Sequence, residues 1–365
     1  MNLIEHLDFY QHVKPNKLFL FDERHFYSVK ESFDLVSSLA IQMDEFGIRK
    51  DDMVFFSFER STYAVLLFFS LEMVKAHALL LDPDGEEITF DESQVHYEIS
   101  GGDGIFFLKD LHDNRRILFN FKRNEKVFQG QNIDEDDFDF VVFDKKGRGT
   151  KISENHLLSI VEEVNQRLAY KEGDVSLVMT SMNHIPGILQ LVFAVTLQHA
   201  LFIPRSLKGE DLEVFLDRFC VSRMSGTLMD YHLLIQNNLS TKKRKRHMRI
   251  GLLWGDYGEQ QMKEMEKSLS VLLVPIYGIN ECPIISLHGV NERGWNRRRG
   301  LGKGLKDTQF LFTAQGKLRI KSSCLSKGYL DGEVMVDAEG FVKTDDPIFI
   351  DKKGNLCFPR MSDLK

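Results

Sequence analysis

Glu281 is the residue whose surroundings most clearly suggest chemistry. It lies in the segment "IYGINECPIIS" (276–286), between one aliphatic run that ends at Ile276 and another that begins after Cys282. A carboxylate flanked by apolar stretches usually has a ligand or a cation that neutralises it. Gly278 is also unusual, because glycine weakens a strand interior and often marks a close approach to a ligand. The segment predicts a binding role for Glu281, with a solvated acid at a strand end as the alternative.

Several other kinds of site are excluded by the sequence. The four cysteines are far apart and form no Cys-x-x-Cys pair, which indicates reduced thiols, not a zinc site or a disulfide framework. The sequence contains neither a Gly-x-Ser-x-Gly nucleophile elbow nor a Gly-x-x-x-x-Gly-Lys-Ser/Thr phosphate loop. The formal net charge of -7 argues against nucleic acid as the main partner.

The bulk composition is that of a folded protein. With 365 residues, 43% of them hydrophobic, the chain can form two or more lobes around buried cores. Acidic residues interrupt the apolar N-terminal segment, which is therefore not a signal peptide. The longest apolar stretch, at 63–74, contains Glu72 and is too short to span a bilayer. We expect a cytoplasmic protein that does not span a membrane.

Regular elements must position Glu281, and the sequence alternates helix and strand patterns. The expected helices lie at 28–47, 61–75, 154–170, 184–200 and 258–269, and the expected strands at 53–58, 140–144, 173–181, 201–205, 248–256 and 271–278. Such alternation is typical of parallel sheets covered by helices. Beyond residue 300, short strands separated by glycines predict an antiparallel region.

The expected fold class is α/β, with stacked, mostly parallel sheets flanked by helices and a β-rich subdomain after them. We expect a first α/β subdomain at 1–140, a second at 141–295, and the β-rich subdomain at 296–365.

Taken in order, these segments resemble the large N-terminal domain of the adenylate-forming ligases. That superfamily comprises acyl- and aryl-CoA synthetases, adenylation domains of peptide synthetases, and luciferases. The segments that carry the resemblance are the helix and strand at 28–58, the helix and strand at 64–83, the stretch at 154–189, and "YGINE", "KGYL", "VKTDD" and "PRMSDLK". The resemblance covers nearly the whole chain. It implies the superfamily's fold and formation of an acyl- or aryl-AMP from a small carboxylic acid and ATP.

The resemblance assigns nucleotide-binding roles to four residues of two segments. In the superfamily's Tyr-Gly-x-Thr-Glu loop, the Tyr packs on adenine, the Thr donates to a phosphate, and the Glu helps to hold Mg²⁺. The matching residues are Tyr277, Asn280 and Glu281, with Gly278 in the same loop. Asp346 in "KTDD" matches a carboxylate whose two oxygens accept from both ribose hydroxyls. The alternative for Asp346 is an ordinary turn acid.

Four further residues are matched by the same resemblance. Arg360 in "FPRMSD" matches a ribose-contacting arginine just before the superfamily's hinge. In "LLWGDYG", Gly255 matches backbone that lies along adenine, and Asp256 has a polar role there; the alternative is a turn in which Asp256 caps a helix. His184 in "MNHIPG" matches a residue at the entrance of the acyl pocket and is the catalytic candidate. A structural role is the alternative for His184.

The phosphate loop departs from the superfamily's pattern. The superfamily has a run of Ser, Thr and Gly that wraps the nucleotide phosphates, and this chain has "FDKKGRGTKI" in its place. Gly149, Thr150 and Lys151 retain the residue types of a short anion-binding nest. However, the Ser/Thr run is missing, and Asp144 would repel a triphosphate. The alternative is a basic hairpin turn that needs no ligand.

The second departure is at the hinge. "PRMSDLK" resembles it, and the sequence ends there, at Lys365. In the superfamily a lid domain of roughly a hundred residues follows, and it carries a lysine that stabilises the reaction's developing charge. We expect the lid domain to be absent, to be supplied by a separate polypeptide, or to be lost by truncation of the reading frame.

Two functions follow from the resemblance and its departures. The first is an acid-AMP ligase that uses ATP and Mg²⁺, with transfer to CoA or to carrier-protein phosphopantetheine as a further step and a lid or carrier protein as partner. The second is a catalytically degenerate relative that serves as a nucleotide- or acyl-binding or scaffold subunit. The sequence alone leaves open whether the protein is an enzyme.

Overall fold

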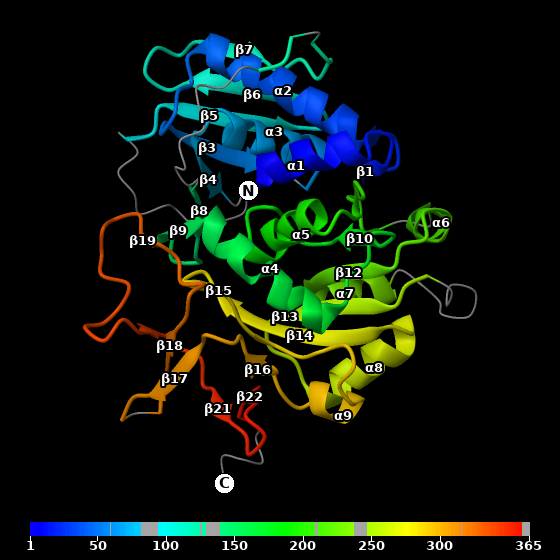
Figure 1. The fold of residues 1–365 in the computed structure, drawn as a ribbon, viewed down its shortest axis with the longest axis vertical. Helices are drawn as coiled ribbons and strands as arrows, with labels where there is room; N and C mark the ends of the chain where they lie inside the picture. The colour runs from blue at the N-terminus through cyan, green and yellow to red at the C-terminus, as the bar shows by residue number, and fades with distance from the viewer. Residues whose placement is uncertain are drawn as a thin grey trace.

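Two large sheets with helices between them make up most of the molecule (Figure 1). The computed structural model describes residues 1–58, 60–81, 94–124, 126–128, 139–208, 211–236, 247–314 and 316–359. The expected α/β class, with mostly parallel sheets and a β-rich end, is confirmed. Among the described helices, none combines the length and apolar character that crossing a bilayer requires.

The first sheet has eight strands. In spatial order they are β19 (Gly328–Tyr329), β9 (Gly149–Ser153), β8 (Asp139–Phe143), β4 (His77–Leu81), β3 (Met53–Phe58), β5 (Tyr97–Gly102), β6 (Ile105–Asp110) and β7 (Arg116–Leu118). The central strands β8, β4, β3 and β5 are parallel. The outer pairs are antiparallel, and β19 joins the far edge from more than 170 residues along the chain.

The second sheet has nine strands. Their order is β16 (Lys303–Gly304), β15 (Cys282–Leu287), β14 (Leu272–Ile279), β13 (Ile250–Trp254), β12 (Arg223–Thr227), β10 (Val175–Val178), β11 (Ala200–Phe202), β1 (Leu18–Phe21) and β2 (Phe26–Ser28). The six strands from β14 to β1 are parallel. Strands β1 and β2, near the start of the chain, belong to this sheet, whereas β9 belongs to the first sheet. Segments from before and after residue 140 therefore contribute to both sheets.

Helices cover both sheets. They are α1 (Leu3–Val13), α2 (Val29–Phe46), α3 (Thr62–Met73), α4 (Glu154–Leu168), α5 (Ile185–Thr196), α6 (Asp211–Arg218), α7 (Leu228–Gln236), α8 (Glu259–Leu269) and α9 (Gly294–Arg297). Helix α2 is bounded by local capping signals, close to the expected range 28–47. Ser28 and Glu31 form a reciprocal capping box at its start, and Gly47 ends it with a φ of 124°.

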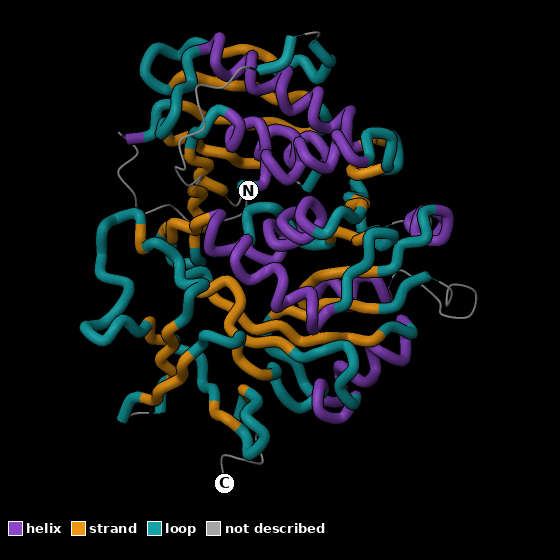
Figure 2. Tube along the Cα trace, in the orientation of Figure 1, coloured by secondary structure: helices purple, strands orange, loops and turns teal. Residues whose placement is uncertain are grey.

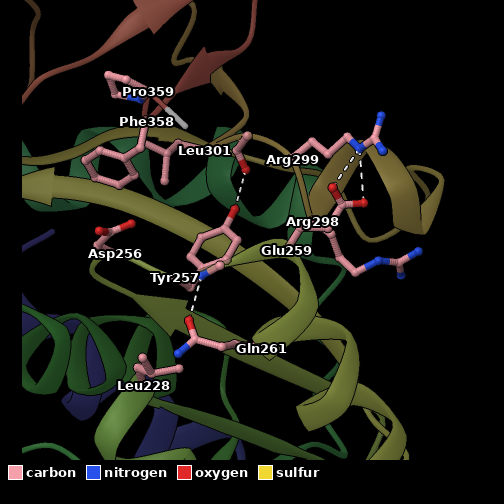
Figure 3. Close-up of a pocket in the computed structure, with 12 residues that line it drawn as sticks. Leu228, Asp256, Tyr257, Glu259, Gln261, Arg298, Arg299, Leu301, Phe358 and Pro359 are labelled. Atoms are coloured by element: carbon pink, nitrogen blue, oxygen red, sulfur yellow. Dashed lines mark hydrogen bonds and ion pairs between the residues drawn. The ribbon is translucent and has the colours of Figure 1, made fainter. Parts of the chain in front are cut away.

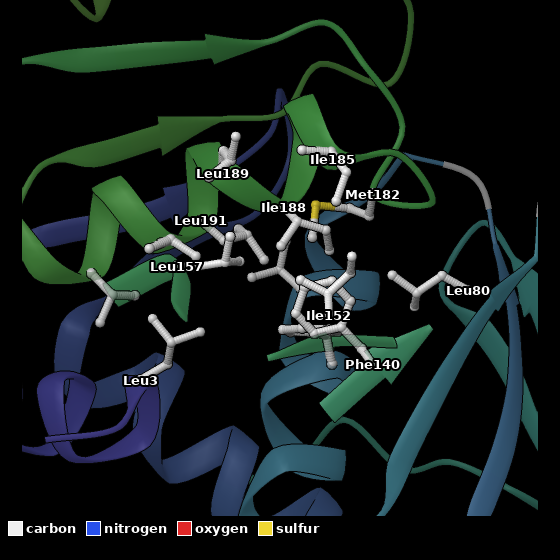
Figure 4. Close-up of a cluster of buried hydrophobic side chains, with 14 of the residues drawn as sticks. Leu3, Leu80, Phe140, Ile152, Leu157, Met182, Ile185, Ile188, Leu189 and Leu191 are labelled. Carbon is white, nitrogen blue, oxygen red and sulfur yellow. The ribbon is translucent and has the colours of Figure 1, made fainter. Parts of the chain in front are cut away.

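The main core lies between the two sheets. Phe140 of β8 and Ile152 of β9 come from the first sheet, and Ile188 of α5 comes from the helices on the second; all three are buried in one cluster (Figure 4). Helix α5 is apolar on nearly every side, as expected for a helix enclosed between two layers. The two sheets therefore share one core.

The chain beyond residue 300 consists of short strands joined by long loops (Figure 2). Strands β17 (Gln309–Phe312), β18 (Leu318–Lys321) and β20 (Val342–Lys343) form an antiparallel sheet, and β21 (Phe349–Ile350) pairs with β22 (Leu356–Cys357). The predicted antiparallel region is confirmed. It packs beside the second sheet through the isolated bridge between Gly302 and Leu356.

Two buried carboxylates hold the N-terminus of α1. The backbone N–H of Leu3 donates to Glu154 of α4, and that of Ile4 donates to Glu72 of α3 at 2.9 Å. Both glutamates are buried almost completely. Burial, and next the negative charge of Glu154, raises the pKa of Glu72 well above its ordinary value, against the opposing effects of the Ile4 N–H and Lys75. The pair is therefore most favourable when Glu72 is protonated.

The Glu72→Gln variant should lose less stability than the wild type as the pH rises. A carboxyl whose pKa folding raises contributes stability that is complete below its unfolded pKa and is lost as the pH rises toward the folded pKa. Glutamine keeps the shape and stays neutral. We expect the variant to gain about 1–3 kcal/mol over the wild type as the pH rises above the ordinary glutamate pKa of 4.5, the usual cost of an uncompensated buried polar group. Urea unfolding at several pH values measures this, and parallel stability curves would contradict it.

Candidate nucleotide-binding site

A cavity of about 450 Å³ lies where β12 and β13 end (Figure 3). Leu228 follows β12 and Asp256 follows β13, so both line the cavity from the carboxyl ends of parallel strands. Open α/β sheets place their ligands at this edge. Phe358 and Pro359 close the cavity from the end of the described chain.

Tyr257 and three charged residues form the polar wall of the cavity. The Tyr257 hydroxyl donates to the carbonyl oxygens of Arg297 (3.1 Å) and Gly300 (2.5 Å), which fixes the ring. Glu259 accepts two hydrogen bonds from Arg299 at 3.0 and 2.9 Å, and Arg298 lines the same wall. Tyr257 and Phe358 were missed by the sequence interpretation, although Tyr257 directly follows the predicted pair at 255–256.

Asp256 lines the cavity, and Gly255 precedes it directly in the chain. Gly255 has a φ of 86°, which favours glycine, and no heavy atom lies within 4 Å of the position that a Cβ would take. The backbone there is open on one side. The alternative role for Asp256 is wrong, because α8 begins at Glu259 and its N-cap is Gly258. The exposed Asp256 residue forms part of the cavity wall instead.

Tyr277 and Asp346 are brought together from distant parts of the chain. The Tyr277 hydroxyl donates to Asp346 Oδ2 at 2.8 Å. The Tyr277 ring meets Phe358, a wall of the cavity, edge to face with 6.2 Å between the ring centroids. Burial, and next the negative charge of Asp346, raises the pKa of Tyr277, so its hydroxyl stays protonated as the donor.

Gly278 and Asn280 have roles in the hairpin between β14 and β15. A Cβ on Gly278 would lie 2.0 Å from the Pro283 carbonyl oxygen, so the close approach that requires glycine is to the neighbouring strand. The pairing register shifts at the same point. The Asn280 carbonyl accepts from Ser326 Oγ at 2.6 Å, which ties the turn to the β-rich region.

The predicted partner of Glu281 is provided by the protein. Glu281 Oε1 accepts from the Tyr329 hydroxyl at 2.6 Å and lies 3.4 Å from Arg148 Nη2. The Arg148 guanidinium lies over the Tyr329 ring, 4.1 Å from its centroid. Only 14% of the Glu281 side chain is exposed. A cation therefore lies beside Glu281, and it is an arginine; the role of Glu281 in holding Mg²⁺ stays a prediction.

The segment at 144–151 is a β-hairpin turn followed by a strand. The Asp144 carboxylate accepts from the backbone N–H groups of Lys146 (2.8 Å) and Arg148 (3.0 Å). Gly149, Thr150 and Lys151 lie in β9, paired to β8 on one side, and β19 pairs with the last two on the other. This geometry favours the interpretation of a hairpin turn, because the turn's own carboxylate occupies N–H groups that a phosphate would need.

The remaining two candidates are His184 and Arg360. His184 is the exposed N-cap of α5, and its side chain makes no capping hydrogen bond. The residues that line the cavity include none from α5. Arg360 lies outside the described residues, although its neighbour Pro359 lines the cavity.

The fold is that of the N-terminal domain of the adenylate-forming ligases, as the resemblance implied. The chain is similar to the N-terminal domain of FACL13 from Mycobacterium tuberculosis, with a TM-score of 0.80 and 13% identity over 99% of this chain and 100% of that one. It is also similar to VinN in complex with L-aspartate, with a TM-score of 0.78 and 12% identity over 99% and 98% of the two chains.

The third similar structure is the unliganded O-succinylbenzoate coenzyme A synthetase (MenE) from Bacillus subtilis. The TM-score is 0.77 and the identity 15%, over 98% of this chain and 78% of that one. No family model and no curated protein sequence matches this chain. At these identities the likeness establishes the fold, and the activity has to be argued from the site.

Proposed function

We propose that this protein binds an adenylate at the cavity beside Asp256, as a relative of the acyl- and aryl-acid adenylate-forming ligases. The observation that carries the proposal is the hydrogen bond between Tyr277 and Asp346. It places a half-buried carboxylate against Tyr277, whose ring contacts Phe358 of the cavity wall, at the edge where parallel sheets bind ligands. The pair lies in two of the segments that resemble the superfamily's nucleotide site.

In this proposal the adenosine is held by Asp256 of the cavity wall and by residues that neighbour the wall. The purine lies along the open backbone at Gly255, and Asp256 accepts from its amino group. Because Tyr277 occupies Oδ2 of Asp346, Oδ1 accepts from a ribose hydroxyl, and Arg360 contacts the ribose from the chain that follows Pro359. A pocket with apolar walls and a few placed polar groups is the usual form of a cofactor site.

The carboxylic acid is the second ligand of the proposal. Its place would be near the N-terminus of α5, where His184 is exposed, and CoA or a carrier-protein phosphopantetheine would accept the acyl group. The neighbours support small acids as a class, since one was solved with L-aspartate. These roles rest on the likeness of fold, and we place the reaction in the cytoplasm on the same ground.

Calorimetric titration tests the nucleotide claim. We expect AMP and a non-hydrolysable acyl-AMP mimic to bind with a stoichiometry of one, and GMP to bind much more weakly because its amino group is placed differently against Asp256. Heat of binding for none of the adenine compounds would remove the proposal. Pyrophosphate exchange against a panel of acids then tests catalysis separately.

The second candidate function is a binding subunit without ligase activity. The hairpin at 144–148 favours it. The Asp144 carboxylate accepts from two backbone N–H groups of the turn, and the Arg148 guanidinium forms an ion pair with Glu281. Phosphoryl-type transfer depends on stabilising charge at the phosphates, and this arrangement satisfies the protein's own groups instead. Binding of AMP without exchange for any acid would favour this function over the first.

A further inference from the structure

Arg148 is held beside the β14–β15 turn, which follows Tyr277 of the proposed site, by groups from three segments. Its Nη2 lies 3.4 Å from Glu281 in the β14–β15 turn and 3.5 Å from Asp144 in its own hairpin. Its guanidinium covers the ring of Tyr329 in β19. An arginine stacked on an aromatic ring and paired to two carboxylates has little freedom, so its position is set before any ligand binds.

The residues do not fit the Mg²⁺ ion that the superfamily's Glu implies. Glu281 Oε1 already interacts with the Tyr329 hydroxyl and the Arg148 guanidinium. Mg²⁺ requires several oxygen ligands in octahedral geometry, and at Glu281 it would face the positive charge of Arg148. Within the described ranges, no group of three or more His, Cys, Asp or Glu side chains is arranged to hold a metal ion.

The hairpin is equally unsuited to a triphosphate. Two of its N–H groups are used by Asp144, and a triphosphate that extended over the hairpin would also meet the carboxylates of Asp144 and Glu281. A triphosphate carries several negative charges, whereas an acyl-AMP carries one and AMP no more than two. The charge of Arg148 therefore suits one phosphate group.

Arg148 retains donors for that phosphate. Arginine has five N–H donors in a planar fork that matches phosphate oxygens, and both carboxylate contacts use Nη2. The side chain is 36% exposed, which leaves part of it open to a ligand. Glu281 and Asp144 would orient the fork, and Nη1 and Nε would donate to the phosphate.

We infer that the site binds an adenine nucleotide with a single phosphate group, with Arg148 as its cation and without a divalent metal. The inference rests on the proposed function above and narrows its ligand class to nucleoside monophosphates and adenylate esters. The inferred ligand differs from the superfamily's ATP with Mg²⁺. The difference follows from three residues of this chain, Arg148, Glu281 and Tyr329.

Calorimetry on the full chain tests the inference with AMP and ATP, each with millimolar Mg²⁺ or with EDTA. We expect AMP to bind more tightly than ATP, with an affinity that is the same in Mg²⁺ and in EDTA. Arg148→Ala should weaken AMP binding by about 10- to 100-fold, the usual effect of losing charge-assisted hydrogen bonds. The same variant releases Glu281, so ATP binding should become dependent on Mg²⁺.

Two further variants distinguish a specific role of Arg148 from an effect of net charge. Lys146→Ala removes the same charge from an exposed position in the same turn, and it should leave AMP affinity unchanged. Arg148→Lys keeps the charge without the fork and should weaken binding less than alanine does; it also serves if Arg148→Ala fails to fold. Equal losses of AMP affinity in Lys146→Ala and Arg148→Ala would mean that net charge alone causes the effect, and would overturn the inference.

The outcomes also distinguish this inference from the proposed function. Tighter binding of ATP than of AMP in the wild type, with a requirement for Mg²⁺, would overturn the inference and leave the adenylate site standing. Absence of binding for both nucleotides in Mg²⁺ and in EDTA would overturn the proposed function, and the inference with it.

Discussion

The Asp174→Ala variant should lose about 3–5 kcal/mol of unfolding free energy, the loss expected when one partner of a buried ion pair is removed. Asp174 precedes β10, and its carboxylate accepts from Arg223 Nε at 2.5 Å and from Ser222 Oγ at 2.8 Å. Asp174 and Arg223 are both buried almost completely. Without Asp174, the Arg223 charge would stay in the core with only carbonyl oxygens and the Tyr170 ring, 4.0 Å away, as partners.

The acid dependence of stability should change in the same variant. Burial alone would raise the pKa of Asp174, but the charge of Arg223 and hydrogen bonds from Lys171, Ser222 and Arg223 lower it overall. A carboxyl with a lowered folded pKa contributes stability that is present above its ordinary pKa and is lost as the pH falls through the folded pKa. The wild type should therefore lose this contribution in acid, and Asp174→Ala should not show that loss.

Urea unfolding followed by circular dichroism measures both effects. Arg249→Ala is the matched control, because Arg249 also contacts Asp174 but its side chain is 45% exposed; we expect a loss of about 0–1 kcal/mol. A loss below about 1 kcal/mol for Asp174→Ala would contradict the role that we assign to the buried pair.

The Asp346→Ala variant should bind AMP at least about 100-fold more weakly than the wild type. Each hydrogen bond to a charged group contributes roughly 1.5–3 kcal/mol, and the proposal gives Asp346 a ribose contact besides its bond to Tyr277. The loss of Asp346 also leaves the buried Tyr277 hydroxyl without this acceptor, which loosens the ring beside Phe358. Calorimetric titration with AMP measures the change.

Neighbouring residues supply the controls for Asp346. Asp345 carries the same charge one position earlier, but its side chain is 87% exposed and faces Lys317; Asp345→Ala should bind AMP as the wild type does. Tyr277→Phe keeps the ring and removes the donor to Asp346, so it should weaken AMP binding less than Asp346→Ala. Equal losses in Asp345→Ala and Asp346→Ala would contradict a specific ribose contact.

Much of the fold was predictable because its signals are local. The capping box at Ser28 and the glycine at position 47 bound α2 close to the predicted range 28–47, since capping depends on residues within one turn. The alternation of helices and strands predicted parallel sheets, which the structure confirms. The pairing of Phe21 with Phe202, which brings β1 into the second sheet, has no local signal and could not be inferred from the sequence.

The site was predictable in part for the same reason. Apolar flanks around Glu281 indicated that the carboxylate would need a partner, but a sequence does not show which distant cation reaches it. Arg148 lies 133 residues away along the chain, and the choice between a metal ion and an arginine depends on how the β8–β9 hairpin meets the β14–β15 turn. The cavity walls at Leu228 and Phe358 are likewise set by packing between distant segments.

A crystal structure of the protein with AMP tests the central claim most directly. We predict the purine beside Gly255 and Asp256, a ribose hydroxyl within hydrogen-bond distance of Asp346, and the phosphate at Arg148 with no metal ion between them. AMP bound at another surface, or a cavity that remains without nucleotide at saturating AMP, would contradict the account.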